Sequence, residues 1–471
     1  MDGTFDKDVL AKLPLAESAL TLLRWMLPSD GIEKVFEDNR GRAYTKEVTF
    51  GNFVTILGDC LTGPWKSARA GLLAAVDEDQ LGVSTRAFYS KLAGMPVEVG
   101  TALLRYGFER TEQVLPKKWE VRPKSLNAYQ VLLLDGKTIK HVPRRGRALQ
   151  WSNDIGCKLL GGKSLVLCNR WTKLVVDLEP NLDGEVNELT LVSGLLDRVG
   201  HTFTEPFLIV GDRGFGIFEV CRQIQAAKGD FMLRKHGQTK FVADPNQQVM
   251  NSKDRFGRDV TETIGWIVRG KKVKSRPQES IPVRMITVKR DNLDLVFITS
   301  LLDSTRFPVD DLLDAYLDRW DIENVFQQVT QVFNLKELFS TSPKGMMFQQ
   351  VYCFLIYNAI HVVKSIIAHH KKRPVQSLSS EMLFRSIREQ LIAANQLIPD
   401  QKLEGLIREF KDVATIREFL VGRLADSWSV GWPKANWKPR DPSKPTKPKP
   451  IKVKQTKSHD SVQRILVKLK T

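Results

Sequence analysis

The spacing of apolar residues predicts helices in the first part of the chain. The first 125 residues carry apolar positions three and four apart and no convincing strand. Within this region Ser84 is placed to cap a short helix, in which Phe88 and Leu92 would face the core. Arg86 and Tyr89 would then face outward. Such a helix is typical of the recognition helix of a helix-turn-helix unit, although a small helical bundle gives the same pattern.

The middle of the chain changes to short apolar runs, which predict strands. The runs are VLLLDG (131–136), SLVLC (164–168), TKLVVDLE (172–179), FLIVGD (207–212), FMLRK (231–235) and VFITSLL (296–302). IFEVCRQIQAAK, at 217–228, has helical spacing and connects two of these runs, so the pattern indicates an α/β sheet layered with helices. Residues 236–295 are more polar and their composition favours strands, which predicts a β-strand-rich insertion. The last apolar run, 296–302, is then expected to return to the core sheet.

The last third of the chain is predicted to be helical and then to end in a basic arm. VYCFLIYNAIHVV, at 351–363, is too short to span a bilayer and carries Asn358 and His361, so it predicts a buried core helix. From Lys434 to Lys470 the chain has twelve Lys or Arg and two Asp among many prolines. This composition predicts a disordered basic arm, which serves either solubility or contact with a polyanion.

Composition narrows the class of partner. A formal net charge of +17 and a pI near 9.5 favour a polyanionic partner, although a basic protein without one has the same composition. Five scattered cysteines include no CxxC pair, which predicts neither disulfides nor a zinc site and suits a reducing cytoplasm. The opening MDGTFDKDVLAKL has acidic residues where a secretory signal needs basic ones.

Two carboxylates follow predicted strands. Asp135 comes after VLLL and Asp212 after FLIVG, and the carboxyl ends of strands are where α/β sheets place their chemistry. Together with a glutamate from a packed helix, they would form an all-oxygen cluster suited to Mg²⁺ or Mn²⁺. For either aspartate alone, an ordinary turn or capping role is the competing interpretation.

The third carboxylate is expected in YLDRWDIENVFQQVT, at 316–330. At helical pitch Tyr316, Arg319 and Glu323 share one helix face, which presents a phenol, a guanidinium and a carboxylate together. An apolar stripe of Ile322, Phe326, Val329 and Phe333 runs beside Glu323 and would fix its direction by packing.

These stretches resemble the motifs of a known enzyme family. LLLDGKTIK around Asp135, IVGDRGFG around Asp212 and YLDRWDIENVF around Glu323 resemble the three motifs of DDE transposases of the insertion-sequence-four family. The resemblance implies an RNase H-like, retroviral-integrase-type core. It also implies that Asp135, Asp212 and Glu323 hold two Mg²⁺ ions, which Mn²⁺ can replace, while Tyr316 and Arg319 contact phosphates at the transposon end.

The resemblance further implies a function. The chain would cut insertion-element ends and join them to target DNA, by two-metal hydrolysis and transesterification. Its partners would be double-stranded DNA, both terminal inverted repeats and target, and a second copy on paired ends, with no membrane. It would act in the bacterial cytoplasm, at the nucleoid. A transposase-derived DNA-binding protein without activity and an RNase H-like nuclease are the alternatives.

With this resemblance the chain divides into six parts. They are a helical DNA-binding region (1–125), the first part of the RNase H-like core (126–235), the β insertion (236–295), the second part of the core with the glutamate helix (296–372), a C-terminal helical region (373–432) and the basic tail (433–471).

One position departs from the family pattern. The signature continues E-x6-K, which calls for a lysine at position 330, and this chain has Thr330. Lys336 lies about 10 Å further along a helix and cannot replace it. The expected loss is one charge-assisted phosphate contact, which the substitution Thr330→Lys would restore.

Three further residues are candidates for DNA contact. Arg213 and Arg234 lie near the expected crevice and suit phosphate, although Arg234 equally suits a core carboxylate. Trp266, in the insertion, suits stacking on a flipped base, as in hairpin-forming relatives, or an ordinary core or edge position.

Overall fold

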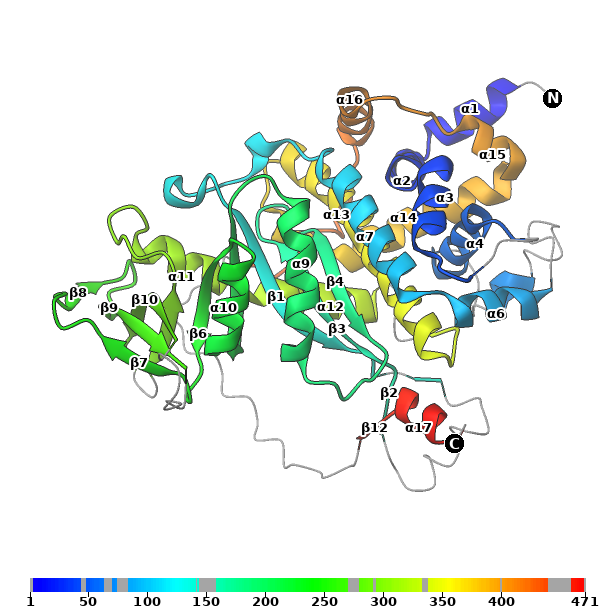
Figure 1. Ribbon diagram of the computed structural model, residues 1–471. Coiled ribbons are helices and arrows are strands. Elements are labelled where there is room, and N and C mark those ends of the chain that lie inside the picture. Colours follow the sequence, from blue (N-terminus) through cyan, green and yellow to red (C-terminus); the bar gives the residue numbers. More distant parts are fainter. Residues whose placement is uncertain are drawn as a thin grey trace.

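The structure is a computed structural model of one chain, shown in Figure 1. It describes residues 3–43, 48–62, 70–73, 84–140, 142–143, 158–269, 279–290, 294–332, 338–398, 400–438 and 459–469. A β-sheet of parallel and antiparallel strands forms the centre. Helices cover both of its faces, a helical body lies at one end and a β-rich part at the other (Figure 1).

The central strands follow the apolar runs of the sequence. They are β1 (Gln130–Thr138), β3 (Lys163–Asn169), β4 (Val175–Asn181), β5 (Phe207–Gly216) and β6 (Asp230–Lys235), while the short β2 (Lys158–Leu160) lies outside this sheet. β1 pairs antiparallel with β3 and parallel with β5, β3 pairs antiparallel with β4, and β5 pairs parallel with β6. The resulting order is β4-β3-β1-β5-β6, so β1 lies in the middle of this part of the sheet.

The β-rich part extends the same sheet. Its strands are β7 (Lys240–Ala243), β8 (Met250–Lys253), β9 (Asp259–Val268), β10 (Ser280–Val288) and β11 (Leu295–Thr299). β11 pairs antiparallel with β6, as expected for VFITSLL, and the order continues through β10 and β9 to β7, with β8 also on β9. A buried ion pair between Arg284 and Glu262 joins β10 to β9, and Arg284 also donates to the Phe307 carbonyl at 2.7 Å. Backbone pairing therefore ties the insertion to the core.

Helices cover both faces of the sheet. The 3₁₀-helix η3 (Glu188–Leu191), α9 (Val192–Thr202) and α10 (Phe218–Ala226) lie on one face, and α11 (Val309–Leu317), α12 (Trp320–Gln331) and α13 (Pro343–His370) on the other (Figure 1). Of the described helices, α13 alone is long and apolar enough to cross a membrane, but its apolar window is wholly buried inside the fold. The prediction of a buried core helix at 351–363 is confirmed.

A single helical body combines both ends of the chain. Its helices are α1 (Gly3–Ala11), α2 (Pro14–Met26), α3 (Ser29–Asn39), α4 (Phe50–Thr62), α6 (Thr85–Gly94), α7 (Val97–Glu112), α14 (Ser380–Leu397), α15 (Asp400–Leu406) and α16 (Val413–Leu424). α2 packs against α13, α14 and α16, and α7 packs against both α13 and β4. Three short 3₁₀-helices are Lys117–Trp119, Lys124–Leu126 and Val375–Ser377.

The final segment differs from the predicted disordered arm. Residues 459–469 form β12 (His459–Ser461), which pairs parallel with β2, and α17 (Val462–Lys468). Arg464 pairs with Asp183 at 2.8 Å and Glu185 at 2.5 Å, and Val462 is fully buried. Apolar residues within this basic segment thus pack it against the core. Residues 439–458, the proline-rich part of the predicted arm, lie outside the described residues.

Candidate active site

Asp135 and Asp212 lie on neighbouring strands where the pairing of β1 with β5 stops, and not at the strand ends expected from the sequence, since both strands continue beyond them. The parallel pairing of β1 and β5 runs to Leu134 opposite Gly211, and each aspartate is the next residue of its strand. The preceding residues of both strands are buried, so apolar packing fixes where each aspartate emerges. Asp212 Oδ1 accepts the Gly214 backbone N–H at 2.7 Å. The structure therefore brings these two predicted residues together.

Asp135 has a strongly perturbed environment. Burial raises its pKa to about 7, while Arg319 and the Gly136 N–H, which donates to Oδ1 at 2.8 Å, act to lower it. Asp212 and Glu323 are near enough to raise the pKa of Asp135 further through like-charge repulsion. Both other predicted carboxylates thus act electrostatically on Asp135.

The helix expected at 316–330 is interrupted. α11 ends at Leu317 and α12 begins at Trp320, and the backbone between them makes tight turns, with Arg319 N donating to the Tyr316 carbonyl at 3.1 Å and Ile322 N to that of Arg319 at 3.2 Å. The prediction of one continuous helix is wrong here. In this turn Asp318 accepts from Arg170 at 2.8 Å.

Arg319 lies between two of the carboxylates. Its Nη1 is 3.5 Å from Asp135 Oδ2, and its Nη2 is 3.0 Å from Glu323 Oε1. Its side chain is 7% exposed, whereas that of Glu323 is 40% exposed. The guanidinium supplies the positive charge that this carboxylate cluster requires.

Tyr316 completes the group. Its ring packs edge-on against Phe297 of β11, with 4.5 Å between ring centroids. Burial raises the pKa of Tyr316, and Arg319 and Arg234 oppose the rise. Tyr316 and Arg319 are therefore neighbours of the carboxylates, and Arg234 is a neighbour of Tyr316.

Packing aims the glutamate helix. Ile322, Val325, Phe326 and Val329 of α12 are buried, which leaves Glu323 at the edge towards the sheet. Phe333, the last residue of the predicted stripe, lies outside the described residues. The amphipathic pattern of α12 is thus as expected up to Val329.

The oxygen-only donor set has the chemistry that Mg²⁺ and Mn²⁺ prefer. Within the described ranges, however, no three His, Cys, Asp or Glu side chains are grouped closely enough to hold a metal ion as they stand. The guanidinium of Arg319 takes up the space between Asp135 and Glu323. Arg319 therefore supplies the positive charge between these two carboxylates in the structure.

One residue of the site was missed by the sequence reasoning. Lys137 Nζ donates to Thr330 Oγ1 at 2.7 Å and to the Phe326 carbonyl at 3.3 Å. Burial lowers the pKa of Lys137 to about 8, with a further contribution from Lys140. Its position two residues after Asp135, on the same face of a strand, was the signal available in the sequence.

The space around Gly136 explains why position 136 has no side chain. A Cβ built on Gly136 would lie 2.3 Å from Glu188 Cδ, a residue of η3. Lys163 lies 3.6 Å from the same carboxylate. Glycine follows Asp135 because Glu188 takes the space that a side chain would need.

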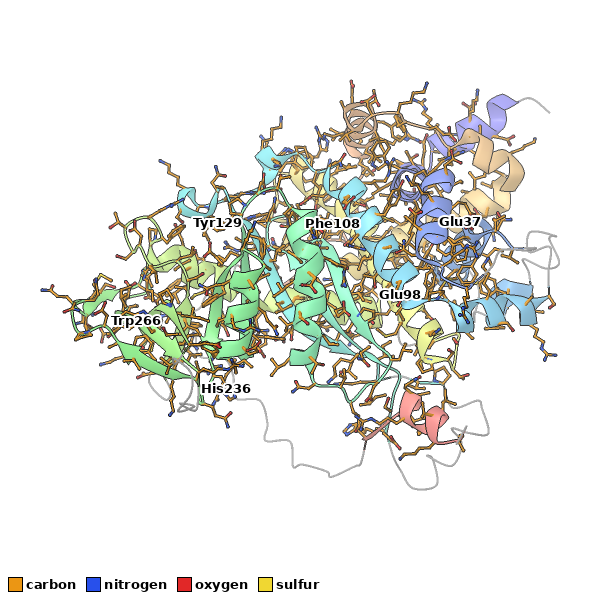
Figure 2. The ribbon with its side chains drawn as sticks, viewed as in Figure 1. Glu37, Glu98, Phe108, Tyr129, His236 and Trp266 are labelled. Carbon is orange, nitrogen blue, oxygen red and sulfur yellow. The ribbon has the colours of Figure 1, made fainter. Side chains whose placement is uncertain are left out.

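The other predicted DNA-contact residues lie away from this group or at its rim. Arg213 is exposed, one residue beyond Asp212. Trp266 is half-buried on β9, in the outer part of the insertion and distant from the centre of the sheet (Figure 2).

The predicted recognition helix is present as α6. Ser84 caps it through the Ala87 N–H at 3.3 Å, and Phe88 and Leu92 are buried, as expected. Arg86 is exposed and Tyr89 half-buried. The segment that would hold the first helix of the pair lies mostly outside the described residues, so the helix-turn-helix stays a prediction.

Acidic residues on neighbouring parallel strands, joined by a glutamate from a helix, are typical of enzymes that cut phosphodiesters with divalent metal ions. Residues 126–359 match the family model "Transposase DDE domain". Over this span, which holds Asp135, Asp212 and Glu323, the chain is similar to the DDE transposases, a family that uses divalent metal ions. The resemblance seen in the three sequence motifs is confirmed at this level.

Two known proteins are similar. The "Transposase InsG for insertion sequence element IS4" of Escherichia coli (strain K12) is 28% identical over 112 residues, which make up 21% of this chain and 25% of that protein. The matched segment therefore spans only a quarter of that relative. A cryo-EM structure of a piggyBac transposase synaptic complex with hairpin DNA has 10% identity over 90% of this chain and 85% of that chain, with a TM-score of 0.38.

Proposed function

We propose that the chain is a DNA transposase that cuts the ends of an insertion element and joins them to target DNA. The observation that supports the proposal is that Asp135 and Asp212 lie on paired strands and Arg319 links Asp135 to Glu323, all within the span that matches the DDE domain. The strand order β4-β3-β1-β5-β6, with its antiparallel first three strands and parallel last three, supports an RNase H-like core.

Each site residue has a role in this proposal. Asp135, Asp212 and Glu323 would hold two Mg²⁺ ions, or Mn²⁺. When bound, such ions promote attack on the phosphorus and neutralise the leaving oxygen. Arg319 and Tyr316, which face the carboxylates from the α11–α12 turn, would contact the phosphates of the DNA end.

The proposed reaction has two balanced steps. Water attacks the phosphorus at the element end, the bond from phosphorus to the 3′ oxygen breaks, and the 3′ oxygen leaves with a proton. The freed 3′ hydroxyl then attacks a target phosphorus and releases a target 3′ oxygen. A flank hairpin between these steps is compatible with the same chemistry. No covalent link to the enzyme forms.

The surroundings of the site suit a DNA partner. Arg213, Arg234 and the exposed Arg86 would add phosphate contacts, with Tyr89 beside Arg86 and Trp266 further out on the insertion. Cutting two ends together favours a homodimer on paired inverted repeats. Such a protein would work in the bacterial cytoplasm, at the nucleoid.

The test uses purified protein, Mg²⁺ and a duplex taken from the DNA that flanks the reading frame. We expect a new 3′ hydroxyl at the element end. Asp135→Asn, Asp212→Asn and Glu323→Gln should each abolish cleavage and leave DNA binding intact. Asp197→Asn, at an exposed carboxylate of α9, is the control and should cut normally. Normal cleavage by any of the three site variants would contradict the assignment.

One observation favours a second candidate. Thr330 stands where the family pattern has lysine, which suits a transposase-derived protein that binds ends without cutting them. Binding of the duplex without any 3′ hydroxyl product would select this candidate. Cutting that ignores the inverted repeat would instead select an RNase H-like nuclease.

A further inference from the structure

Lys137 and Asp135 emerge on the same side of β1. Side chains two residues apart on a strand share a face, and on this face α12 lies across β1. On α12, Thr330 is seven residues beyond Glu323, about two helical turns, and so lies on nearly the same side of the helix. The contact between Lys137 and Thr330 is therefore a second connection between the element of the first aspartate and that of the glutamate.

The ammonium of Lys137 is held by neutral groups. It donates to Thr330 Oγ1 at 2.7 Å and to the Phe326 carbonyl at 3.3 Å, and it lies 5.4 Å from the centre of the Phe326 ring. The Thr330 hydroxyl donates to the same carbonyl at 2.7 Å, so its oxygen is free to accept from Lys137. Among the described residues no carboxylate lies within ion-pair distance of Lys137.

This arrangement contrasts with that of two other cations near the site. Arg319 lies against Asp135 and Glu323, and Lys173 pairs with Asp321 at 2.6 Å. A half-buried lysine with neutral partners and no acidic partner is suited to an anion from outside the protein. A DNA strand at the neighbouring carboxylates would bring phosphates to this place.

We propose that Lys137 supplies the phosphate-binding cation that the E-x6-K pattern places at position 330, and that Thr330 is its positioning residue. The proposal rests on the proposed transposase function. In this chain the cation comes from β1, and the helix contributes a hydroxyl that directs it. Thr330 is then the partner of a relocated lysine.

The test measures both cleavage and the salt dependence of binding to the flanking duplex. Lys137→Met should cut roughly 10- to 100-fold more slowly, as expected for one lost charge-assisted contact. The slope of log affinity against log salt should fall by about one, because one phosphate contact is lost. Lys124→Met is the control, since Lys124 is exposed before the opposite end of β1.

Exchanging residues 137 and 330 tests whether the position of the ammonium matters or only its presence. The double variant Lys137→Thr/Thr330→Lys places the ammonium on the helix α12 instead of the strand β1. We expect it to recover at least half of the salt dependence that Lys137→Thr loses. It should also cut faster than Lys137→Thr. Thr330→Lys alone places two ammonium groups together, and we expect no gain in cleavage. This reverses the expectation drawn from the sequence pattern.

The outcomes separate this proposal from the function on which it rests. No cleavage by the wild type would overturn the transposase function, and the salt slope would still test the phosphate contact. Normal cleavage by Lys137→Met, or slow cleavage with an unchanged salt slope, would overturn the role of Lys137. The urea midpoint of Lys137→Met should match the wild type, and a lower midpoint with unchanged slope would assign it a structural role only.

Discussion

Three consecutive residues of β1 have three different tasks. Asp135 and Lys137 point towards α12, and Gly136 between them faces the other side of the sheet, where Glu188 lies. The tripeptide is therefore constrained on both faces. Its middle position tolerates no side chain unless Glu188 moves.

Gly136→Ala should destabilise the protein. The new Cβ would lie within 2.5 Å of both Glu188 carboxylate oxygens, which no real contact permits. We expect a loss of at most about 1 kcal/mol in the free energy of unfolding, the low end of the range for overpacking, because the clashing atoms end a flexible side chain that is 35% exposed and can turn away. Urea denaturation measures it. The double variant Gly136→Ala/Glu188→Ala should recover most of the loss, because the clash is removed.

A matched glycine provides the control for this prediction. Gly200, in α9, has only the Ala227 carbonyl near its added Cβ, at 3.8 Å. Gly200→Ala should be neutral or slightly stabilising, since alanine favours helix. If the double variant at positions 136 and 188 were no more stable than Gly136→Ala, the clash with Glu188 would not be the cause.

At the scale of elements, local patterns predicted the strands and failed at the helix turn. Buried runs such as VLLLDG and FLIVGD specify their own strands, because each is apolar on both faces. The break between α11 and α12 depends on contacts such as that of Asp318 with Arg170, 148 residues away in sequence. No window of sequence contains both partners.

The same limit applies to the site. The candidates Asp135, Asp212 and Glu323 could be chosen from the sequence, since each aspartate follows a buried apolar run and the glutamate lies beside an apolar stripe. The contact of Lys137 with Thr330 joins positions 193 apart, so the sequence suggested an empty position where the structure has a neighbour. Site residues were predictable from pattern, whereas their pairings depended on the fold.

Polar residues inside the long core helix have specific partners. Asn358 accepts the Val175 N–H at 2.8 Å and donates to the Val175 carbonyl at 2.9 Å, so it pairs with the backbone of β4. Lys364 donates to Ser380 Oγ at 3.0 Å. Asn358 thus both donates and accepts, whereas among the described residues the buried ammonium of Lys364 has one hydroxyl partner.

Lys364→Met should stabilise the protein near neutral pH. Burial lowers the pKa of Lys364 from 10.5 to about 7, with repulsion from Lys434 acting in the same direction. Folding therefore favours the neutral amine, and the stability from this group is present above pH 10.5 and lost as the pH falls to 7. We expect a gain of roughly 1–4 kcal/mol at pH 7, the range for apolar replacement of buried charges.

Urea denaturation at pH 7 and pH 9 checks this prediction. The wild type should gain stability between these values relative to the variant, because only the wild type has a lysine to neutralise. An equal change in both proteins would show that Lys364 is not the titrating group. Lys371→Met, just beyond the end of the same helix, is the comparison variant.

At the scale of the whole molecule, the two ends of the chain fold together. The sequence divided residues 1–125 from 373–432, but α2 lies against α14 and α16, and Arg24 pairs with Glu409 at 2.6 Å. α7 and α13 then connect this body to β4. We infer that the proposed DNA-binding helices and the catalytic sheet share one cooperative structure, held by contacts more than 370 residues apart in sequence.

Gln390→Ala tests this coupling at a single atom. α2 begins at Pro14, which has no N–H, and the next two N–H groups, of Leu15 and Ala16, both donate to Gln390 Oε1, at 2.8 and 3.2 Å. A glutamine of α14 thus caps a helix at the other end of the chain. Replacing Gln390 with alanine leaves these two N–H donors without their acceptor. The free energy of unfolding should fall by about 1–3 kcal/mol.

Hydrogen exchange gives the decisive measurement, because a shared structure must loosen on both sides of the contact. In Gln390→Ala we expect amides of α2 and α14 to lose protection together, while Glu389→Ala, at the exposed neighbouring position, leaves both unchanged. If α2 alone lost protection, the two ends would be separate units that merely touch. Loss in both would mean that cutting the chain at residue 373 removes the support of the N-terminal helices as well.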